Sequence, residues 1–426
     1  MKIRNIILNI CFCAYVKRTG HIVKRIDRKE YVSWLLRWKE QQIIKVVSGV
    51  RRCGKSTTLD IFRGHLLENG IDEKQIITLN FEDVENEDLL SYKPLYEFIN
   101  DRLVPGKMNY IFLDEIQHVD KYERTVDSLF LKDNCDVYIT GSNANFLSGE
   151  LATLLSGRYV ELRMLPISFS EFCEIRSEEG KTDNRELFNQ YIEKGSFPYI
   201  SAYDLETRAV NEYLRDIYNT VLLKDIVKRL KVADVTSLEN VTKFLFHSIG
   251  NRISSTKISN TLKSAGKSVD QKTVEKYLKG LTDSFLLYEI KRYNIKGRQH
   301  LTTQSKYYAV DIALRNTLVR GQESDIGHII ENIVYLELLR RGYDVFAGQG
   351  EGDSEVDFVA KKENETIYIQ VTATALDEAV LTRELNPLRK IRDNYAKYLL
   401  TLDDVFGEAV FDGILKKNLV TWLLER

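Results

Sequence analysis

The sequence contains little proline, few cysteines and no long run of apolar residues. Five prolines in 426 residues and no low-complexity tract leave little room for disordered linkers. The five cysteines are odd in number and mostly scattered, which suits a reducing compartment better than a disulfide framework, so we expect a cytoplasmic protein. No second Cys/His pair accompanies Cys11 and Cys13 at zinc spacing, which argues against a metal site there. A formal net charge of −1 argues against a protein that coats nucleic acid with its whole surface.

The apolar stretch from Ile6 to Val16 is interrupted by Asn9 and flanked by Lys and Arg. It is shorter than a membrane-spanning helix and has no small-residue cleavage site, so we predict neither a membrane anchor nor a signal peptide. We therefore treat residues 1–22 as an extension or an extra strand. The remaining length exceeds one ordinary hydrophobic core, which predicts more than one domain.

A phosphate-binding pattern follows a short β-branched strand pattern at residues 43–47. The spacing G-x-x-x-x-G-K-[ST] is met by Gly49, Gly54, Lys55 and Ser56, and a helical pattern comes next. Glycines let such a loop wrap a phosphate chain with its N–H groups inward, and the following helix presents its positive dipole end to the same phosphates. Gly-Lys-Ser alone is common in surface loops, but the flanking strand and helix favour a nucleotide site.

This pattern predicts how ATP and Mg²⁺ are bound. Lys55 is expected to bridge the β- and γ-phosphates, and Ser56 to offer its hydroxyl to Mg²⁺. Cys53 precedes the helix beside Arg52, a setting that favours the thiolate; the alternative is an inert buried cysteine. The nucleotide-binding residues expected from the loop are Gly49, Val50, Arg51, Arg52, Cys53, Gly54, Lys55, Ser56 and Thr57.

Two carboxylates follow a second apolar strand pattern at residues 107–113. Asp114 is expected to reach Mg²⁺ through water, and Glu115 to polarise the water that attacks the γ-phosphate. An acidic pair after a strand is weak evidence alone, but a parallel sheet would bring it to the same edge as a phosphate loop about 60 residues earlier. The predicted metal ligands are therefore Ser56 and Asp114.

A further strand pattern at residues 137–140 ends in polar residues. A side chain at this point can hold the γ-phosphate or the attacking water; Asn143 is the first choice and Ser142 the second, with a plain turn as the alternative.

Arg158 is a candidate for a cation that contacts a γ-phosphate in its own or a neighbouring chain, and a helix cap or surface ion pair is the alternative. Strands that alternate with helices predict a doubly wound α/β parallel sheet with ligands at the carboxyl ends of its strands.

Four stretches carry a family resemblance: GVRRCGKST, YIFLDEIQ, ITGSNANFLSGELATLLSGRYVELRMLPISFSEF and EKGSFPYI. Together they resemble prokaryotic AAA+ superfamily ATPases, specifically those that carry a carboxy-terminal domain of unknown function related to restriction endonucleases. The resemblance covers nearly the whole chain from about Val23. It implies an amino-terminal extension at 1–22, an AAA+ ATPase core at 23–182, a helical lid at 183–233, a winged-helix-like segment at 234–310 and a nuclease-like domain at 311–426.

The predicted winged-helix segment is locally basic. Residues 251–300 contain eleven Lys/Arg and four Asp/Glu, a local balance of +7. Three helical patterns and a strand pattern follow one another over residues 235–291, and in the third helix Lys272, Lys276 and Lys279 lie off the apolar stripe. A helix-turn-helix with a β wing and local positive charge predicts contact with DNA, and a protein–protein or interdomain module is the alternative.

The carboxy-terminal part resembles the skeleton of the PD-(D/E)xK nuclease fold, with Glu355 and Asp357 on one face of a strand and Gln370 and Thr372 on one face of the next. The departure is that threonine stands at the position of the catalytic lysine and glutamine at that of the second acid. Fewer carboxylates bind Mg²⁺ weakly, and without the lysine nothing obvious stabilises the charge that develops on the phosphate. We therefore predict an inactive, vestigial nuclease site formed by Glu331, Glu355, Asp357 and Gln370.

The sequence as a whole predicts a Mg²⁺-dependent, ATP-hydrolysing AAA+ protein that acts as a nucleotide-driven switch on DNA or on a protein partner. An ATP-gated DNA nuclease is one alternative, in which Lys361, Lys362 or Arg383 would replace the missing lysine. A nucleotide-sensing adaptor with negligible turnover is the other. The patterns predict neither the partner nor the oligomeric state.

Overall fold

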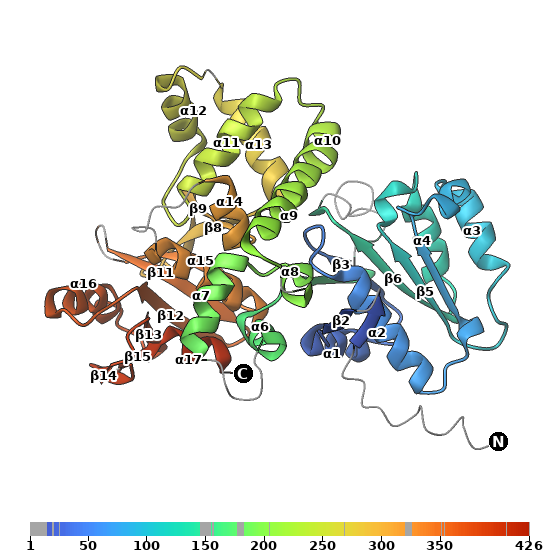
Figure 1. Cartoon of the computed structure of the whole chain (residues 1–426), viewed down its shortest axis with the longest axis horizontal. Coiled ribbons are helices and arrows are strands. Elements are labelled where there is room, and N and C mark those ends of the chain that lie inside the picture. The colour runs from blue at the N-terminus through green and yellow to red at the C-terminus, as the bar shows by residue number, and fades with distance from the viewer. Residues whose placement is uncertain are drawn as a thin grey trace. The chain divides into compact units, whose positions relative to one another are not determined.

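The computed structural model describes most of the chain, and the apolar stretch at residues 6–14 lies outside the described residues. The chain folds into two compact units, one formed by residues 1–166 with 283–285 and the other by 167–282 with 286–426 (Figure 1). The described residues are 15–18, 21–24, 26–144, 155, 157–176, 183–203, 205–267, 269–319, 326–350, 352, 354–405 and 407–425.

The first unit is built on a parallel sheet of five strands in the order β4-β5-β6-β3-β7. This confirms the predicted α/β parallel sheet, although the sequence patterns did not predict its edge strand β7. The bounds are β3 Ile44–Ser48, β4 Ile76–Asn80, β5 Asn109–Asp114, β6 Cys135–Gly141 and β7 Tyr159–Arg163; a separate antiparallel pair is formed by β1 (Tyr15–Arg18) and β2 (His21–Lys24).

Different helices cover the two faces of this sheet. On one face Ile111 of β5 packs in a cluster with Leu95 and Val126, and on the other Phe112 meets Phe62, with ring centroids 6.1 Å apart. Because side chains of a strand alternate between faces, β5 is buried on both sides. The covering elements are α1 (Lys29–Trp38), α2 (Lys55–Glu68), η1 (Glu73–Gln75), η2 (Val84–Leu89), α3 (Tyr92–Asn100), η3 (Ile116–His118) and α4 (Tyr122–Phe130).

The carboxyl ends of the central strands meet at one edge of the sheet. In the register of the strands, Ser48 lies beside Gly141 and Asn80 lies beside Asp114. Helix α2 begins at Lys55, directly after the loop that leaves β3. The glycine-rich loop and the two carboxylates therefore lie at the same edge, which is where open α/β sheets bind their ligands.

The second unit is built on a mixed sheet of eight strands in the order β14-β15-β13-β12-β11-β10-β8-β9. Strands β8 and β9 come from the predicted winged-helix segment, yet β8 pairs in parallel with β10 of the predicted nuclease-like part. The two predicted parts thus share one sheet. The bounds are β8 Leu287–Asn294, β9 Gln299–Ala309, β10 Asp344–Gln349, β11 Glu355–Lys362, β12 Glu365–Thr372, β13 Ala396–Thr401, β14 Ala409–Phe411 and β15 Ile414–Asn418.

Helices precede, interrupt and cover this second sheet (Figure 1). Helix α15 contacts strands β9 to β12 and is buried throughout residues 329–338. The helices are α6 (Phe169–Arg176), α7 (Asn184–Lys194), α8 (Pro198–Tyr203), α9 (Thr207–Thr220), the π-helix η5 (Val221–Val227), α10 (Lys228–Leu230), α11 (Val235–His247), α12 (Ser255–Ser264), α13 (Gln271–Asp283), α14 (Ile312–Leu318), α15 (Ile326–Arg340), α16 (Glu378–Arg389) and α17 (Leu419–Leu424).

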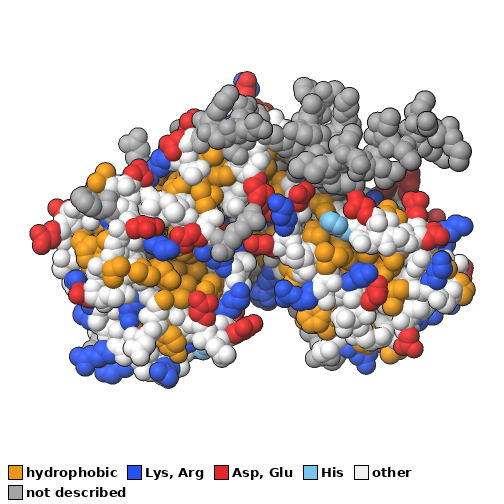
Figure 2. Space-filling model, turned by 90° about the horizontal axis from the view of Figure 1, so that it is seen from below, with side chains coloured by type: hydrophobic (Ala, Val, Ile, Leu, Met, Phe, Trp, Pro, Cys, Tyr) orange, Lys and Arg blue, Asp and Glu red, His pale blue; other side chains and the backbone are white. Residues whose placement is uncertain are grey.

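Charged side chains of both signs are interspersed on the surface. On the face drawn in Figure 2, Lys and Arg side chains lie among Asp and Glu side chains, with hydrophobic side chains exposed between them. This mixture agrees with the net charge of −1. Among the helices of the described residues, none is both long and apolar enough to cross a membrane.

Candidate functional site

The loop between β3 and α2 has the backbone that a phosphate cradle needs. Gly49 and Gly54 have φ angles of +152° and +102°, and a Cβ at Gly49 would lie 2.4 Å from the carbonyl oxygen of Met164. Only glycine tolerates such a close approach in this conformation. Gly54 is the N-cap of α2, so the first N–H groups of that helix open toward the loop. The predicted nucleotide-binding residues 49–57 thus form one continuous loop and helix start.

Lys55 lies inside this loop. Its side chain is buried, and its ammonium group donates to the carbonyl oxygens of Gly49 at 2.9 Å and Val50 at 3.3 Å. The same nitrogen is 3.5 Å from Oε1 of Glu115. A compact cation with three donors can exchange carbonyl oxygens for phosphate oxygens, so this position suits the predicted role.

Asp114 is held by two hydroxyl groups. Its Oδ2 accepts a hydrogen bond from Ser56 Oγ at 2.6 Å, and its Oδ1 accepts one from the hydroxyl of Thr140 on β6. Burial and the charge of Glu115 raise the pKa of Asp114, and the two hydroxyl hydrogen bonds oppose this rise. Carboxylate and hydroxyl oxygens are ligands that Mg²⁺ prefers, so the pair of Ser56 and Asp114 fits a magnesium site. The sequence patterns did not mark Thr140, because a threonine inside an apolar strand carries no motif signal.

Glu115 is the second carboxylate at this edge. Its backbone N–H donates to Thr140 Oγ1 at 2.9 Å, and its carboxylate accepts from Gln117 Nε2 at 2.5 Å. Burial alone would raise the pKa of Glu115, but the ammonium group of Lys55 and the hydrogen bond from Gln117 lower it overall. The charged carboxylate is therefore favoured, which is the form that polarises a water molecule.

Both residues considered for sensing the γ-phosphate are buried after β6. Ser142 Oγ accepts from Gln117 Nε2 at 3.5 Å, and a hydrogen bond to Ser142 helps to lower the pKa of Glu115, after the larger effects of burial and of Lys55. The geometry thus connects the second choice, Ser142, to the carboxylate. Contact of Asn143 with a phosphate stays a prediction.

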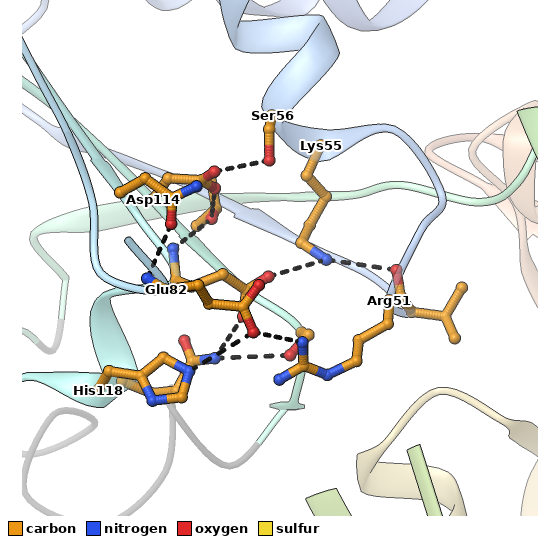
Figure 3. A network of polar contacts seen from close by, with 12 residues as sticks. Arg51, Lys55, Ser56, Glu82, Asp114 and His118 are labelled. Carbon is orange, nitrogen blue, oxygen red and sulfur yellow. Dashed lines mark hydrogen bonds and ion pairs between the residues drawn. The ribbon is translucent and has the colours of Figure 1, made fainter. Parts of the chain in front are cut away.

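Arg51 connects the loop to the end of the neighbouring strand β4. Its NH1 lies 2.6 Å from Oε1 of Glu82, which is also 4.0 Å from Nε2 of His118 (Figure 3). The neighbouring Arg52, with a φ of +67°, is exposed instead. Sequence reasoning did not assign Glu82 or His118 to the site, and the available signal was the acidic pair of Glu82 and Asp83 shortly after β4.

Arg158 lies at the amino ends of the strands, opposite the end that carries the phosphate loop. It precedes β7, and its carbonyl oxygen accepts from the N–H of Ile44, at the start of β3, at 2.8 Å. Its guanidinium group pairs with Asp127 of α4 and lies 5.5 Å from the ring centroid of Phe130. Since the phosphate loop leaves the other end of β3, this position does not bring Arg158 to the phosphate loop of its own chain. A contact with a neighbouring chain's nucleotide stays a prediction.

The expected thiolate at Cys53 is wrong. The side chain is fully buried, and its Sγ lies 3.1 Å from the place that a Cβ of Gly49 would take. Burial raises the pKa of the thiol, and the opposing charges of Lys55 and Arg28 do not offset it. The neighbouring positive charge on which the expectation depended is outweighed by desolvation, so we expect an inert, packed thiol.

In the second unit, the residues of the predicted vestigial nuclease site gather around a lysine. The ammonium group of Lys306 on β9 lies 2.9 Å from Oε1 of Glu331, 2.9 Å from Oε1 of Glu355 and 3.9 Å from Oδ1 of Asp357. Gln370 joins this group because its Oε1 accepts from the backbone N–H of Asp357 at 3.3 Å. Sequence reasoning missed Lys306, which lies on a strand that no pattern predicted.

The charges around Lys306 determine its protonation. Burial alone would lower the pKa of Lys306, but the carboxylates of Glu331, Asp357 and Glu355 raise it well above its usual range. Burial likewise opposes the ionisation of Glu331, but Lys306 outweighs it and lowers the pKa; for Asp357, burial and the charge of Glu331 raise the pKa. Within the described part of the chain, no group of three or more His, Cys, Asp or Glu side chains is arranged to hold a metal ion.

The three residues considered as substitutes for the nuclease lysine are engaged elsewhere. The Nζ of Lys361 lies 3.6 Å from the centroid of a tyrosine ring, and that of Lys362 donates to a backbone carbonyl at 2.9 Å. Arg383 pairs with Glu384 at 2.7 Å. The cation that lies among the carboxylates is therefore Lys306 rather than any of these.

The basic segment presents a line of lysines on α13. Lys272, Lys276 and Lys279 are exposed at spacings of four and three residues, which places them on one side of the helix, opposite the buried Val274 and Leu281. The turn before α12 is attached to the second sheet, because the backbones of residues 253 and 305 exchange hydrogen bonds of 2.9 and 3.0 Å.

The matches to known proteins agree with the geometry of the loop. A family model described as an AAA domain matches residues 41–173, and a domain of unknown function, DUF8612, matches residues 185–325. An uncharacterised protein of Haemophilus influenzae is 38% identical over 402 residues, which are 94% of this chain and 99% of the relative. The uncharacterised protein MJ1544 of Methanocaldococcus jannaschii is 30% identical over 376 residues, which are 85% of this chain and 80% of the relative.

The loop, the carboxylates after β5 and the matched model define a P-loop protein with an AAA-type ATPase domain. The chain belongs to the family of these two uncharacterised proteins. It is also similar to the Walker-type ATPase PABY2304 of Pyrococcus abyssi, with 13% identity and a TM-score of 0.49 over 72% of this chain and 99% of that one.

Proposed function

We propose that this protein binds ATP with Mg²⁺ at the loop of residues 49–57, hydrolyses it, and uses the cycle as a switch that acts on DNA or on a protein partner. The observation that carries the proposal is the arrangement of Lys55, Asp114 and Glu115, with the ammonium group 3.5 Å from the carboxylate of Glu115. The AAA family model over residues 41–173 supports the same conclusion.

The chain's own residues divide the reaction between them. Lys55 and the N–H groups at the start of α2 bind the phosphates, and Ser56 and Asp114 would hold Mg²⁺. The ion, when bound, neutralises charge on the β- and γ-phosphates. Glu115 orients the attacking water and accepts its proton. The hydroxyl of Thr140 donates to the carboxylate of Asp114 and accepts from the backbone N–H of Glu115, so it holds the two neighbouring residues in place.

The loop is tested by substituting its lysine. Lys55→Ala should abolish binding of a fluorescent ATP analogue, because the phosphates lose the cation that contacts them in the ground state. Lys74→Ala, which removes an exposed lysine of η1, is the matched control and should bind the analogue as the wild type does. If Lys55→Ala binds ATP as tightly as wild type, the site is misassigned.

The rate of ATP hydrolysis distinguishes the proposed ATPase from the alternative, a nucleotide-sensing adaptor with negligible turnover. Phosphate release by the wild type, with and without added DNA, should exceed that of Glu115→Gln, whose amide cannot accept the proton of water. If wild type and Glu115→Gln release phosphate at the same background rate while both bind ATP, the protein is a nucleotide sensor rather than an ATPase.

DNA is the partner that one observation favours, namely the exposed line of Lys272, Lys276 and Lys279 on α13. Replacing all three with Glu should weaken binding to duplex DNA, and each lost phosphate contact should flatten the slope of log K against log salt by about 0.9. A matched triple of exposed lysines outside the segment, at positions 74, 107 and 390, should leave the slope unchanged. A wild type without DNA affinity at low salt would favour an interdomain or protein-binding module.

A further inference from the structure

The phosphate loop contains an arginine to which the proposed reaction assigns no role. Arg51 is the third residue of the loop, and its side chain is 12% exposed, whereas the adjacent Arg52 is exposed. Its NH1 lies 2.6 Å from Oε1 of Glu82. Figure 3 shows its guanidinium group on the side of the loop that faces Lys55 and Glu82.

Two observations place this guanidinium group near the reacting atoms. Lys55 lies 3.5 Å from Glu115, so the phosphate-binding lysine and the carboxylate that polarises water face the same small space. Glu82, which holds Arg51 at 2.6 Å, follows β4, and the last residue of β4, Asn80, lies beside Asp114 in the register of the sheet. Arg51 is therefore held at the same edge of the sheet as the carboxylate that acts on the water.

We propose that Arg51 contacts the γ-phosphate of ATP bound to its own chain and stabilises the transferring phosphoryl group, with Glu82 positioning it. This inference rests on the proposed ATPase function. In the reaction a water oxygen bonds to the γ-phosphorus, the bond from that phosphorus to the β–γ bridging oxygen breaks, and the proton of water passes to Glu115. Negative charge then develops on the bridging and γ-oxygens, where a cation is most effective.

The position of Arg158 makes an arginine of the phosphate loop the better candidate for the cation that stabilises the transferring phosphoryl group. Arg158 lies at the amino edge of the sheet in a pair with Asp127, so it would need a neighbouring chain's nucleotide to act on. Arg51 needs no second chain, because it belongs to the loop that wraps the phosphates. A guanidinium group has five N–H donors on three nitrogens, so one group can hold Glu82 and a phosphate oxygen from different nitrogens.

The role of Arg51 is tested with a substitution and with a transition-state mimic. Arg51→Ala should lower kcat by roughly 10²- to 10³-fold and change the affinity for ADP alone by less than about threefold, because the contact strengthens as charge develops. Aluminium fluoride, which takes the place of the transferring phosphoryl group, should tighten ADP binding in the wild type and not in Arg51→Ala. Arg63→Ala, at a half-buried position on α2, removes the same charge as a control and should retain the tightening.

Two further variants test whether Arg51 acts through its contact with the phosphate and whether Glu82 acts through Arg51. Arg51→Lys should recover only part of kcat, because an ammonium group lacks the planar fork that holds a carboxylate and a phosphate together. Glu82→Gln should lower kcat by about tenfold, and adding it to Arg51→Ala should cause no further loss, because the two residues would act through one contact. Additive losses would mean that Glu82 acts independently of Arg51.

The outcomes distinguish this inference from the function on which it rests. If Arg51→Ala keeps the wild-type kcat and the full tightening by aluminium fluoride, the inference is overturned and the proposed ATPase is not. If Arg51→Ala loses affinity for ADP alone, Arg51 binds the ground state and the inference is again overturned. If the wild type neither hydrolyses ATP nor responds to aluminium fluoride, both fail.

Discussion

Each unit of the chain contains a buried lysine beside carboxylates, and the two lysines are held in different ways. Lys55 donates to two backbone carbonyl oxygens and lies 3.5 Å from Glu115. Lys306 lies 2.9 Å from each of two carboxylates and 3.9 Å from a third. The first is surrounded mainly by backbone dipoles, and the second by acidic side chains.

This difference determines which site can exchange partners. A phosphate oxygen competes well against a carbonyl oxygen for an ammonium group, and a metal ion competes well against hydroxyl groups for Asp114. Displacing Lys306 would leave the buried carboxylate of Glu331 without its lysine, which costs several kcal/mol, whereas Glu355 would keep Arg252, whose NH2 lies 2.5 Å from its Oε2. The same residue types therefore form a site prepared for ligands in one unit and a closed, charge-compensated network in the other.

The largest expected difference between the two sites concerns their glutamates. Glu115→Gln should lower ATP hydrolysis on the order of a thousandfold while leaving ATP binding intact, because the amide cannot take the proton of water. Glu331→Gln, measured in the same phosphate-release assay, should retain wild-type turnover. A loss of hydrolysis in Glu331→Gln without loss of folding would show that the two networks are coupled.

The next largest effect concerns stability. Lys306→Met should destabilise the second unit by about 3–5 kcal/mol, because it leaves the buried carboxylate of Glu331 without its lysine, whereas Lys55→Met, which removes a longer contact with one carboxylate, should cost less. Denaturant unfolding followed by fluorescence measures both. The double variant Lys306→Met with Glu331→Gln should recover part of the loss, and a loss that grows instead would contradict the ion-pair account.

A smaller effect is the pH dependence of folding stability, which should have opposite signs for two acidic residues of the Lys306 network. The pKa of Glu331 is lowered by folding, so its stabilisation is present above its unfolded pKa and lost as pH falls through the folded one. The pKa of Asp357 is raised, so its contribution is present below its unfolded pKa and lost as pH rises through the folded one.

These opposite signs predict opposite responses to neutral substitutions at pH 7 and above. Glu331→Gln should lower the melting temperature, whereas Asp357→Asn, which mimics the neutral acid, should preserve or raise it. Thermal unfolding across the pH range measures both. A melting temperature of Asp357→Asn that falls below wild type by more as pH increases would contradict the raised pKa of Asp357.

The smallest expected effect is on nucleic acid. We expect no cleavage of plasmid or single-stranded DNA above background with Mg²⁺ or Mn²⁺, with or without ATP, because the carboxylates that would hold the metal are paired with Lys306. Asp357→Ala should therefore leave a nicking assay unchanged. Cleavage by the wild type that disappears in Asp357→Ala would make the ATP-gated nuclease the better account.

The parts of the first site that the sequence predicted depend on local spacing. Gly49, Gly54, Lys55 and Ser56 lie within eight residues, and their roles follow from one strand, one loop and the start of one helix. The position of Asp114 followed from the rule that parallel strands end at the same edge. Local rules of this kind also predicted strands β3, β5 and β6 of the first unit and helices α11 to α13 of the second.

The residues that the sequence did not predict depend on contacts between distant parts of the chain. Thr140 is a polar residue in an apolar strand, and its role appears once β6 is placed beside β5. Lys306 lies 25 residues before Glu331 and 51 before Asp357, on a strand whose pairing with β8 no pattern indicated. The burial of Cys53 likewise depends on the packing of the loop rather than on its charged neighbour.

The pairing of β8 with β10 determines where this chain can be cut. A fragment that ends at residue 310 would keep β8 and β9 but lose β10, and would expose the N–H and C=O groups of β8 to pairing with other chains. A fragment that begins there would expose the matching edge of β10. Residues 234–310 and the carboxy-terminal part should therefore be expressed, exchanged between homologues and inherited as a single piece.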